Sequence, residues 1–172
     1  MLGTLEKPDS GEILIDGINH LKLSSNKLSN FRNTNIGFIF QFHQLLPEFS
    51  AIENICLPAL IKGLSMKYAQ KEASKLLEIL NLSSRAEHKP NELSGVEQQR
   101  IAVARSLINQ PKVIFSDEPS GNLDSNNSKE LHQLFFDLRD EFNQTFVIIT
   151  HNNELSEMTD RKLIMQDGNL IG

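Results

Sequence analysis

LSGVEQQR occupies residues Leu93–Arg100, and VIFSDEP follows at Val113–Pro119 after a helix-length segment. The first stretch is a turn of small residues that opens into a helix, and the start of a helix points backbone N–H groups at a phosphate. The second is an apolar run that ends in two carboxylates, as expected where a buried strand brings acids to the edge of a sheet. Together they predict an α/β protein that handles phosphate groups.

Composition limits the possible functions. The 172 residues are enough for one domain with a sizeable core, and 39% hydrophobic with 23% charged residues fit a folded protein. A net charge of −5 gives no electrostatic reason to expect nucleic acid as a partner. The single cysteine, Cys56, excludes an internal disulfide and fits a buried thiol in a reducing cytoplasm. No G-x-x-x-x-G-K-[ST] loop occurs in this sequence, so the usual P-loop cradle for phosphates is missing from it.

Hydrophobic spacing predicts strands that alternate with helices, and this order favours a parallel sheet. We expect strands at residues 13–15, 36–40 and 146–150, and one that begins at Val113. Helices are expected near residues 24–31, from Ser50 with an interruption at Pro58, from Lys67, after Gly95, and over residues 131–142, with a hairpin at Asp167-Gly168. The mainly helical stretch from about residue 43 to 92 is predicted to be an insertion within a single domain, residues 1–172.

The acidic pair Asp117 and Glu118 has two interpretations. A strand followed by Asp-Glu-Pro is often only a strand that runs into a turn. In the functional interpretation the two acids have separate roles. Asp117 holds Mg²⁺, in part through water, because Mg²⁺ takes few carboxylates and retains waters. Glu118 polarises the water that attacks a γ-phosphate.

In this order the two stretches resemble the signature and Walker B motifs of the ATP-binding-cassette (ABC) ATPases. Residues 117–124, DEPSGNLD, are similar to Walker B running into the D-loop, with Ser120 where threonine is commoner. The resemblance implies ATP and Mg²⁺ as cofactors, Glu118 as the general base, and Asp124 as a residue that meets a second subunit across the nucleotide. It also implies the fold: a P-loop NTPase-like parallel sheet with a helical subdomain.

Two further residues at strand ends match this family. His151, in ITHN, resembles the switch histidine that donates a hydrogen bond to the γ-phosphate, whereas His20, His88 and His132 are expected to be ordinary surface or core residues. Gln41 resembles the Q-loop glutamine that reaches Mg²⁺ and the water. Alone, neither residue type is informative. The order Gln41, Ser94, Asp117, Glu118, Asp124, His151 reproduces that of the family throughout.

The signature residues implied to contact nucleotide are Ser94, Gly95, Val96 and Glu97. Val96 departs from the family, which has a second glycine there, and its branched side chain is expected to crowd the phosphate. Residues 1–12 look like the end of the helix that follows the P-loop. We therefore expect the P-loop and the first strands upstream, and the 172 residues alone to be an inactive part of a longer protein.

FIFQFHQLLPEFSAIEN at Phe38–Asn54 resembles the lipoprotein-releasing (Lol-type) ATPases, which act at the cytoplasmic face of the bacterial inner membrane. The partners implied are transmembrane permease subunits and a second nucleotide-binding subunit. The aromatic and leucine side chains that either dock on a permease or simply pack in the helical subdomain are Phe42, Leu45, Leu46 and Phe49. Three alternatives stay open: a macrolide or other efflux ATPase, a non-catalytic truncated remnant, and the ATPase head of a DNA-repair protein, which the missing coiled-coil insertion disfavours.

Overall fold

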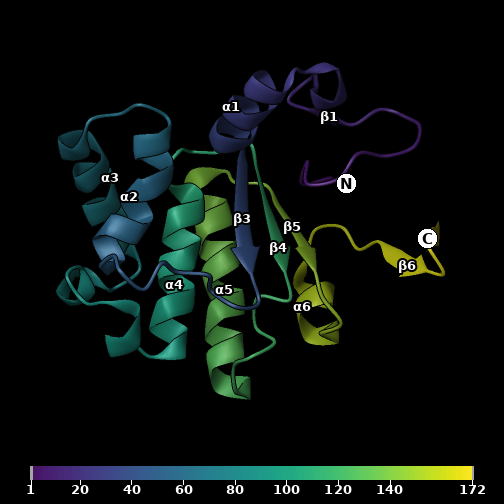
Figure 1. The fold of residues 1–172 in the computed structure, drawn as a ribbon. Coiled ribbons are helices and arrows are strands. Elements are labelled where there is room, and N and C mark those ends of the chain that lie inside the picture. The colour runs from purple at the N-terminus through teal and green to yellow at the C-terminus, as the bar shows by residue number, and fades with distance from the viewer. Residues whose placement is uncertain (1, 172) are drawn as a thin grey trace.

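A computed structural model describes residues 2–171, and its centre is a three-stranded parallel sheet (Figure 1). The strands are β3 (Ile36–Phe40), β4 (Val113–Asp117) and β5 (Phe146–Ile149), side by side in that order. Each is a short run dominated by apolar side chains, as is usual for parallel strands, and helices form the crossovers that parallel pairing requires. The predicted α/β class and all three strand positions are confirmed.

The helices account for most of the remaining chain. They are α1 (Ser25–Asn35), α2 (Ala51–Ile61), α3 (Met66–Ile79), α4 (Gly95–Leu107), α5 (Ser125–Phe142) and α6 (Asn153–Met158), with single 3-10 turns η1 (His20–Lys22), η2 (Ser83–Arg85) and η3 (Pro90–Glu92). Helices α4 and α5 lie along one side of the sheet, and α2 and α3 lie outside α4 (Figure 1). Within residues 2–171, every helix is too short or too polar to span a bilayer.

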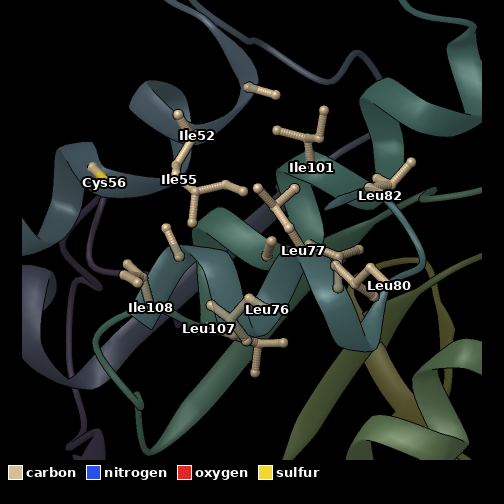
Figure 2. Close-up of a cluster of buried hydrophobic side chains, with 14 of the residues drawn as sticks. Ile52, Ile55, Cys56, Leu76, Leu77, Leu80, Leu82, Ile101, Leu107 and Ile108 are labelled. Carbon is tan, nitrogen blue, oxygen red and sulfur yellow. The ribbon is translucent and has the colours of Figure 1, made fainter. Parts of the chain in front are cut away.

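The largest apolar core joins α2, α3 and α4 to the sheet (Figure 2). Ile55 from α2, Leu77 from α3 and Ile101 from α4 are at most 1% exposed, so each helix turns its apolar face toward the other two. Cys56 belongs to this core, and its burial raises the pKa of the thiol to about 11. The prediction of a buried cysteine is confirmed.

Helix α2 differs from its prediction in one respect. Its capping box forms as expected: the backbone N–H of Ser50 donates to the Glu53 carboxylate, and the backbone N–H of Glu53 donates to the Ser50 hydroxyl. The predicted interruption at Pro58 is wrong, because the helix continues to Ile61. Pro58 lacks only the one N–H that would donate to the carbonyl of residue 54, and the helix ends three residues later. Its carbonyl also accepts a hydrogen bond from the side chain of Asn109 at 3.0 Å, which fixes this turn against the rest of the chain.

Two small hairpins flank the sheet. Strands β1 (Leu14–Ile15) and β2 (Ile18–Asn19) pair antiparallel, as do β6 (Ile164–Gln166) and β7 (Asn169–Ile171). Each turn is Asp-Gly with positive φ at both residues, the conformation that a two-residue hairpin favours. The hairpin predicted at Asp167-Gly168 is therefore confirmed.

The segment ahead of these hairpins does not match its prediction. Residues 2–12 form turns and bends, and the expected end of a helix is not observed in them. Thr4 has a φ of 63°, in the left-handed region, and Pro8 has no N–H to donate. Gly3 lies against the ring of Phe38, since an added Cβ would be 2.7 Å from that ring. Gly3 therefore packs on the sheet, and residues 2–12 do not form a helix.

Candidate functional site

The predicted site residues gather at one edge of the sheet because the ends of the three strands are aligned. Phe40 is paired with Asp117, and Asp117 with Ile149, so the next residues of each strand leave the sheet side by side. Ligands of α/β proteins bind at this carboxyl edge. The residues that the alignment brings there are Gln41, Asp117, Glu118 and His151.

Glu118 is held at this edge in an uncommon backbone conformation. Its φ is 43°, a value that non-glycine residues adopt rarely and often at functional sites. Its carboxylate accepts hydrogen bonds from the backbone N–H of His151 at 2.9 Å and from the Thr150 hydroxyl at 3.2 Å. The same carboxylate lies 2.8 Å from Nδ1 of His151. The Glu118 side chain is 22% exposed, so it is oriented by the protein and still reachable by water.

His151 complements this carboxylate from the loop after β5. Its side chain is 86% exposed, and one ring nitrogen is engaged by Glu118. The other ring nitrogen can therefore reach a molecule outside the chain. A hollow of about 250 Å³ opens beside the pair, lined also by the loop after β4 and the start of α5. The pair can thus act together on a ligand in this hollow.

Gln41 is fixed to the loop after β4. Its side-chain nitrogen donates to Asn122 Oδ1 at 3.3 Å, and Asn122 Nδ2 donates to the Gln41 carbonyl at 3.1 Å. Gly121 permits this approach, because a Cβ there would be 2.8 Å from the Gln41 side-chain nitrogen. Gln99 of α4 donates to the carbonyl of Pro119 at 2.9 Å and ties the same loop to the signature helix.

The groups near Asp117 suit Mg²⁺. Asp117 is exposed, and no group of three or more His, Cys, Asp or Glu side chains in residues 2–171 forms a closed metal cage. Because Gln41 bonds to Asn122 through its nitrogen, its amide oxygen is the atom left to face a cation. One carboxylate and one amide oxygen, with water and phosphate completing the shell, match the way Mg²⁺ is held beside nucleotides.

Asp124 begins α5 as its N-cap residue. Its carboxylate accepts the backbone N–H of Asn126 at 3.0 Å and that of Asn127 at 3.1 Å. These bonds, the one from Asn127 first, lower the pKa of Asp124. The residue is therefore an exposed anion with a local structural role, and its contact with a second subunit stays a prediction.

The signature residues form a separate group at the start of α4. They do not line the hollow beside Glu118. Ser94 is the N-cap residue, and it forms a capping box with Glu97. A Cβ on Gly95 would meet no atom of the described residues within 4 Å, so packing does not require glycine there, and open space is left at the helix start. Val96 is partly buried beside it.

Several contacts of these groups were not predicted from the sequence. Arg85 of η2 donates to the Glu97 carboxylate at 2.8 Å. Arg105 of α4 donates to the carbonyls of His43 and Gln44, at 2.8 and 2.7 Å, and so fixes the chain after Gln41. Arginines of this kind carry no local motif, because their partners lie far along the chain or are backbone carbonyls of a loop. For these contacts, the sequence offered one clue: Ser94 and Glu97 have the spacing of a capping box, which places the Glu97 carboxylate at the helix start.

The remaining histidines behave as predicted in one case and differently in another. His132 is buried, and its Nε2 lies 2.9 Å from the Ser120 hydroxyl, so it is a satisfied core residue. His20 is 1% exposed, yet neither ring nitrogen has a hydrogen-bond partner in the described residues. Burial lowers the pKa of His20, which keeps the ring neutral.

The carboxyl edge with Glu118 and His151, together with the separate helix start at Ser94 and Gly95, is the arrangement expected of the ATP-binding-cassette family. A family model described as "ABC transporter" matches residues 1–121, and the chain belongs to this family. It is 59% identical over 171 residues to the "Lipoprotein-releasing system ATP-binding protein LolD" of Bacteroides fragilis (strain YCH46), covering 99% of this chain and 79% of that protein. It is 58% identical over 171 residues to the protein of the same name from Porphyromonas gingivalis, covering 99% and 78%.

A solved structure supports the same assignment. The "Dimeric structure of a post-hydrolysis state of the ATP-binding cassette MJ0796 bound to ADP and Pi" matches with a TM-score of 0.85 at 37% identity. The match covers 98% of this chain and 74% of that one. The ABC ATPase fold predicted from the sequence is confirmed.

Proposed function

We propose that this chain is the ATP-hydrolysing subunit of an ABC transporter, with Glu118 as the general base. The observation that carries the proposal is the Glu118 carboxylate, placed 2.8 Å from His151 Nδ1 at the carboxyl edge of the sheet. Glu118 takes the proton of the attacking water, and His151 stabilises the charge that develops on the γ-phosphate. Asp117 and Gln41 hold Mg²⁺, which neutralises phosphate charge when it is bound.

The same proposal assigns the signature to a second subunit's nucleotide. Ser94, Gly95, Val96 and Glu97 stand apart from the hollow beside Glu118, and the free space at Gly95 is the kind that an approaching phosphate needs. Asp124 faces the other subunit across the nucleotide. A dimer of the cassette MJ0796 has been solved, which supports this arrangement for a family member.

We further propose lipoproteins as the cargo and transmembrane permease subunits as partners, at the cytoplasmic face of the bacterial inner membrane. The relatives named for lipoprotein release share 59% and 58% of their aligned residues with this chain. Phe42, Leu46 and Phe49 are exposed in the segment that precedes α2, where a permease helix could cover them. Helices α2 and α3 form the helical subdomain, within residues 43–92 of a single domain.

The test uses a hybrid protein in which the P-loop portion of the Bacteroides fragilis relative precedes residue 1, called the P-loop hybrid below. We expect it to hydrolyse MgATP, and with its permease partners in proteoliposomes to release lipoprotein. Hydrolysis with release of a macrolide in place of lipoprotein would indicate the efflux branch. No hydrolysis in the presence of the permease would mean that the chain is a non-catalytic remnant.

The 172 residues by themselves are proposed to lack useful affinity for MgATP. Two neighbouring carboxylates, Asp117 and Glu118, repel a polyphosphate unless Mg²⁺ bridges them, and no lysine-bearing P-loop occurs in the sequence to offset this. Isothermal titration of the purified 172-residue chain checks the proposal. Micromolar binding of MgATP would contradict it.

A further inference from the structure

The side chain of Ser94 is oriented by one carboxylate. The Ser94 hydroxyl donates to Glu97 Oε2 at 2.9 Å, and the Ser94 backbone N–H donates to the same oxygen at 2.8 Å. The backbone N–H of Glu97 in turn donates to the Ser94 hydroxyl oxygen at 3.3 Å. Any change in the position or charge of the Glu97 carboxylate therefore changes where the hydroxyl of Ser94 points.

The second oxygen of this carboxylate is held from outside the helix. Arg85 Nε donates to Glu97 Oε1 at 2.8 Å. Arg85 ends the 3-10 turn η2, whose backbone is fixed by a hydrogen bond from the Arg85 N–H to the Leu82 carbonyl at 2.9 Å, and Leu82 is buried in the helical core. The link therefore runs from the helical subdomain to the first residue of the signature.

The contact with Arg85 also compensates the negative charge of Glu97. A carboxylate three residues from a serine that faces a phosphate repels the phosphate unless its charge is compensated. Arg85 is the charged side chain that acts on Glu97, and its hydrogen bond holds the pKa of that carboxyl at about 2, well below its usual value. Glu97 is therefore an anion at neutral pH, and Arg85 supplies the matching positive charge.

We propose that Arg85 is a positioning residue for the signature: through Glu97 it fixes Ser94 as the cap of α4 and neutralises the carboxylate beside it, so that the free backbone N–H groups at the start of α4 can accept a partner subunit's nucleotide. The proposal rests on the proposed ATPase function. Stability alone is a weak explanation for the ion pair, because the two side chains are 42% and 24% exposed, and exposed ion pairs contribute little to folding.

The test compares four variants in the P-loop hybrid. Arg85→Ala is expected to lower kcat about tenfold, the size of effect usual for a residue that acts through one neighbour. The affinity for MgATP stays unchanged, since each subunit binds nucleotide through its own P-loop. Arg85→Lys restores part of the rate, because it returns the charge with a different geometry. Lys89→Ala is the matched control: Lys89 is an exposed cation of the same segment, and no side-chain ion pair to it occurs in residues 2–171.

The fourth variant, Glu97→Gln, separates positioning from general damage. In the Glu97→Gln background, Arg85→Ala should have little further effect, because its target carboxylate is gone. An undiminished loss in that background would overturn the proposal. So would normal kcat in Arg85→Ala, or equal losses in Arg85→Ala and Lys89→Ala.

A second measurement does not depend on hydrolysis. Carbon-13 NMR of the Glu97 carboxyl, with and without the P-loop portion, should give a titration midpoint that rises in Arg85→Ala and partly returns in Arg85→Lys. Exchange of the Ser94 amide proton should be faster in Arg85→Ala. An inactive wild-type hybrid with these shifts present would reject the ATPase function while upholding the link, and unchanged shifts would reject the link itself.

Discussion

Glu97 at the start of α4 and Glu118 at the end of β4 are two glutamates of similar local chemistry with different surroundings. Each carboxylate accepts a backbone N–H, from Ser94 in one case and from His151 in the other. Glu97 also faces a guanidinium, which cannot take up its proton, whereas Glu118 faces an imidazole that is 86% exposed and has a second ring nitrogen open to solvent.

This difference indicates which of the two carboxylates can act as a general base. A carboxylate locked to Arg85 by an ion pair stays charged and holds structure in place. A carboxylate beside a solvent-facing histidine, a hydroxyl and an open hollow can accept a proton from water and pass it on.

The largest expected effect comes from replacing the Glu118 carboxylate by an amide. In the P-loop hybrid, Glu118→Gln should lower single-turnover ATP hydrolysis about 10²- to 10⁴-fold, because the amide keeps the shape but cannot take a proton. MgATP binding should persist, as equilibrium titration can show. Glu97→Gln is the matched change and should cost far less turnover. Near-normal hydrolysis in Glu118→Gln would remove Glu118 from the role of base.

Lowering the pH should reveal how much the ionised Glu97 carboxylate contributes to the stability of the fold. The folded-state pKa of Glu97 is about 2, below its unfolded value, so Glu97 stabilises the fold at neutral pH and loses this contribution as the pH falls from about 4.5 towards 2. The contribution is at most about 1 kcal/mol, because the ion pair with Arg85 is partly exposed to solvent. Chemical denaturation at pH 7 and pH 3 measures it. Arg85→Ala should flatten the difference between the two pH values, and an unaltered difference would contradict the assignment.

Removing the hydroxyl that Glu97 orients should have a smaller effect on stability. Ser94→Ala is expected to lower the free energy of unfolding by about 1 kcal/mol, the usual value for an N-cap, and to reduce turnover of the P-loop hybrid as well. Ser65→Ala is the control, because Ser65 caps α3 in the same way, with the Tyr68 N–H at 3.3 Å, away from the signature. Thermal melts and steady-state assays of both variants decide; equal turnover in the two would show that the Ser94 hydroxyl has only a capping role.

The smallest effect is expected at Val96. Val96→Gly should raise ATP-dependent dimerisation or turnover of the P-loop hybrid modestly, because it extends the open space at Gly95. The substitution also costs about 0.4 kcal/mol of helix propensity, because glycine favours a helix less than valine does. Turnover in the presence of the permease partner measures the balance. Equal rates for both proteins would mean that this signature functions with valine.

The sequence by itself determined the class of protein. Strand and helix positions followed from hydrophobic periodicity, because a side chain's place in the core depends on its spacing along the chain. Hairpins followed from Asp-Gly pairs and helix starts from capping residues, which act within a few residues of themselves. The order of Gln41, Asp117, Glu118 and His151 indicated the ABC family, which the relatives confirm.

The tertiary structure decided what each acid contacts. The pairing of Arg85 with Glu97, the hold of Arg105 on the loop after Gln41, and the continuation of α2 past Pro58 all depend on groups brought together by packing. Such contacts join residues far apart in sequence, so no local pattern encodes them. Whether a carboxylate is locked or free to take a proton depends on its neighbours in space, and only the folded chain supplies those neighbours.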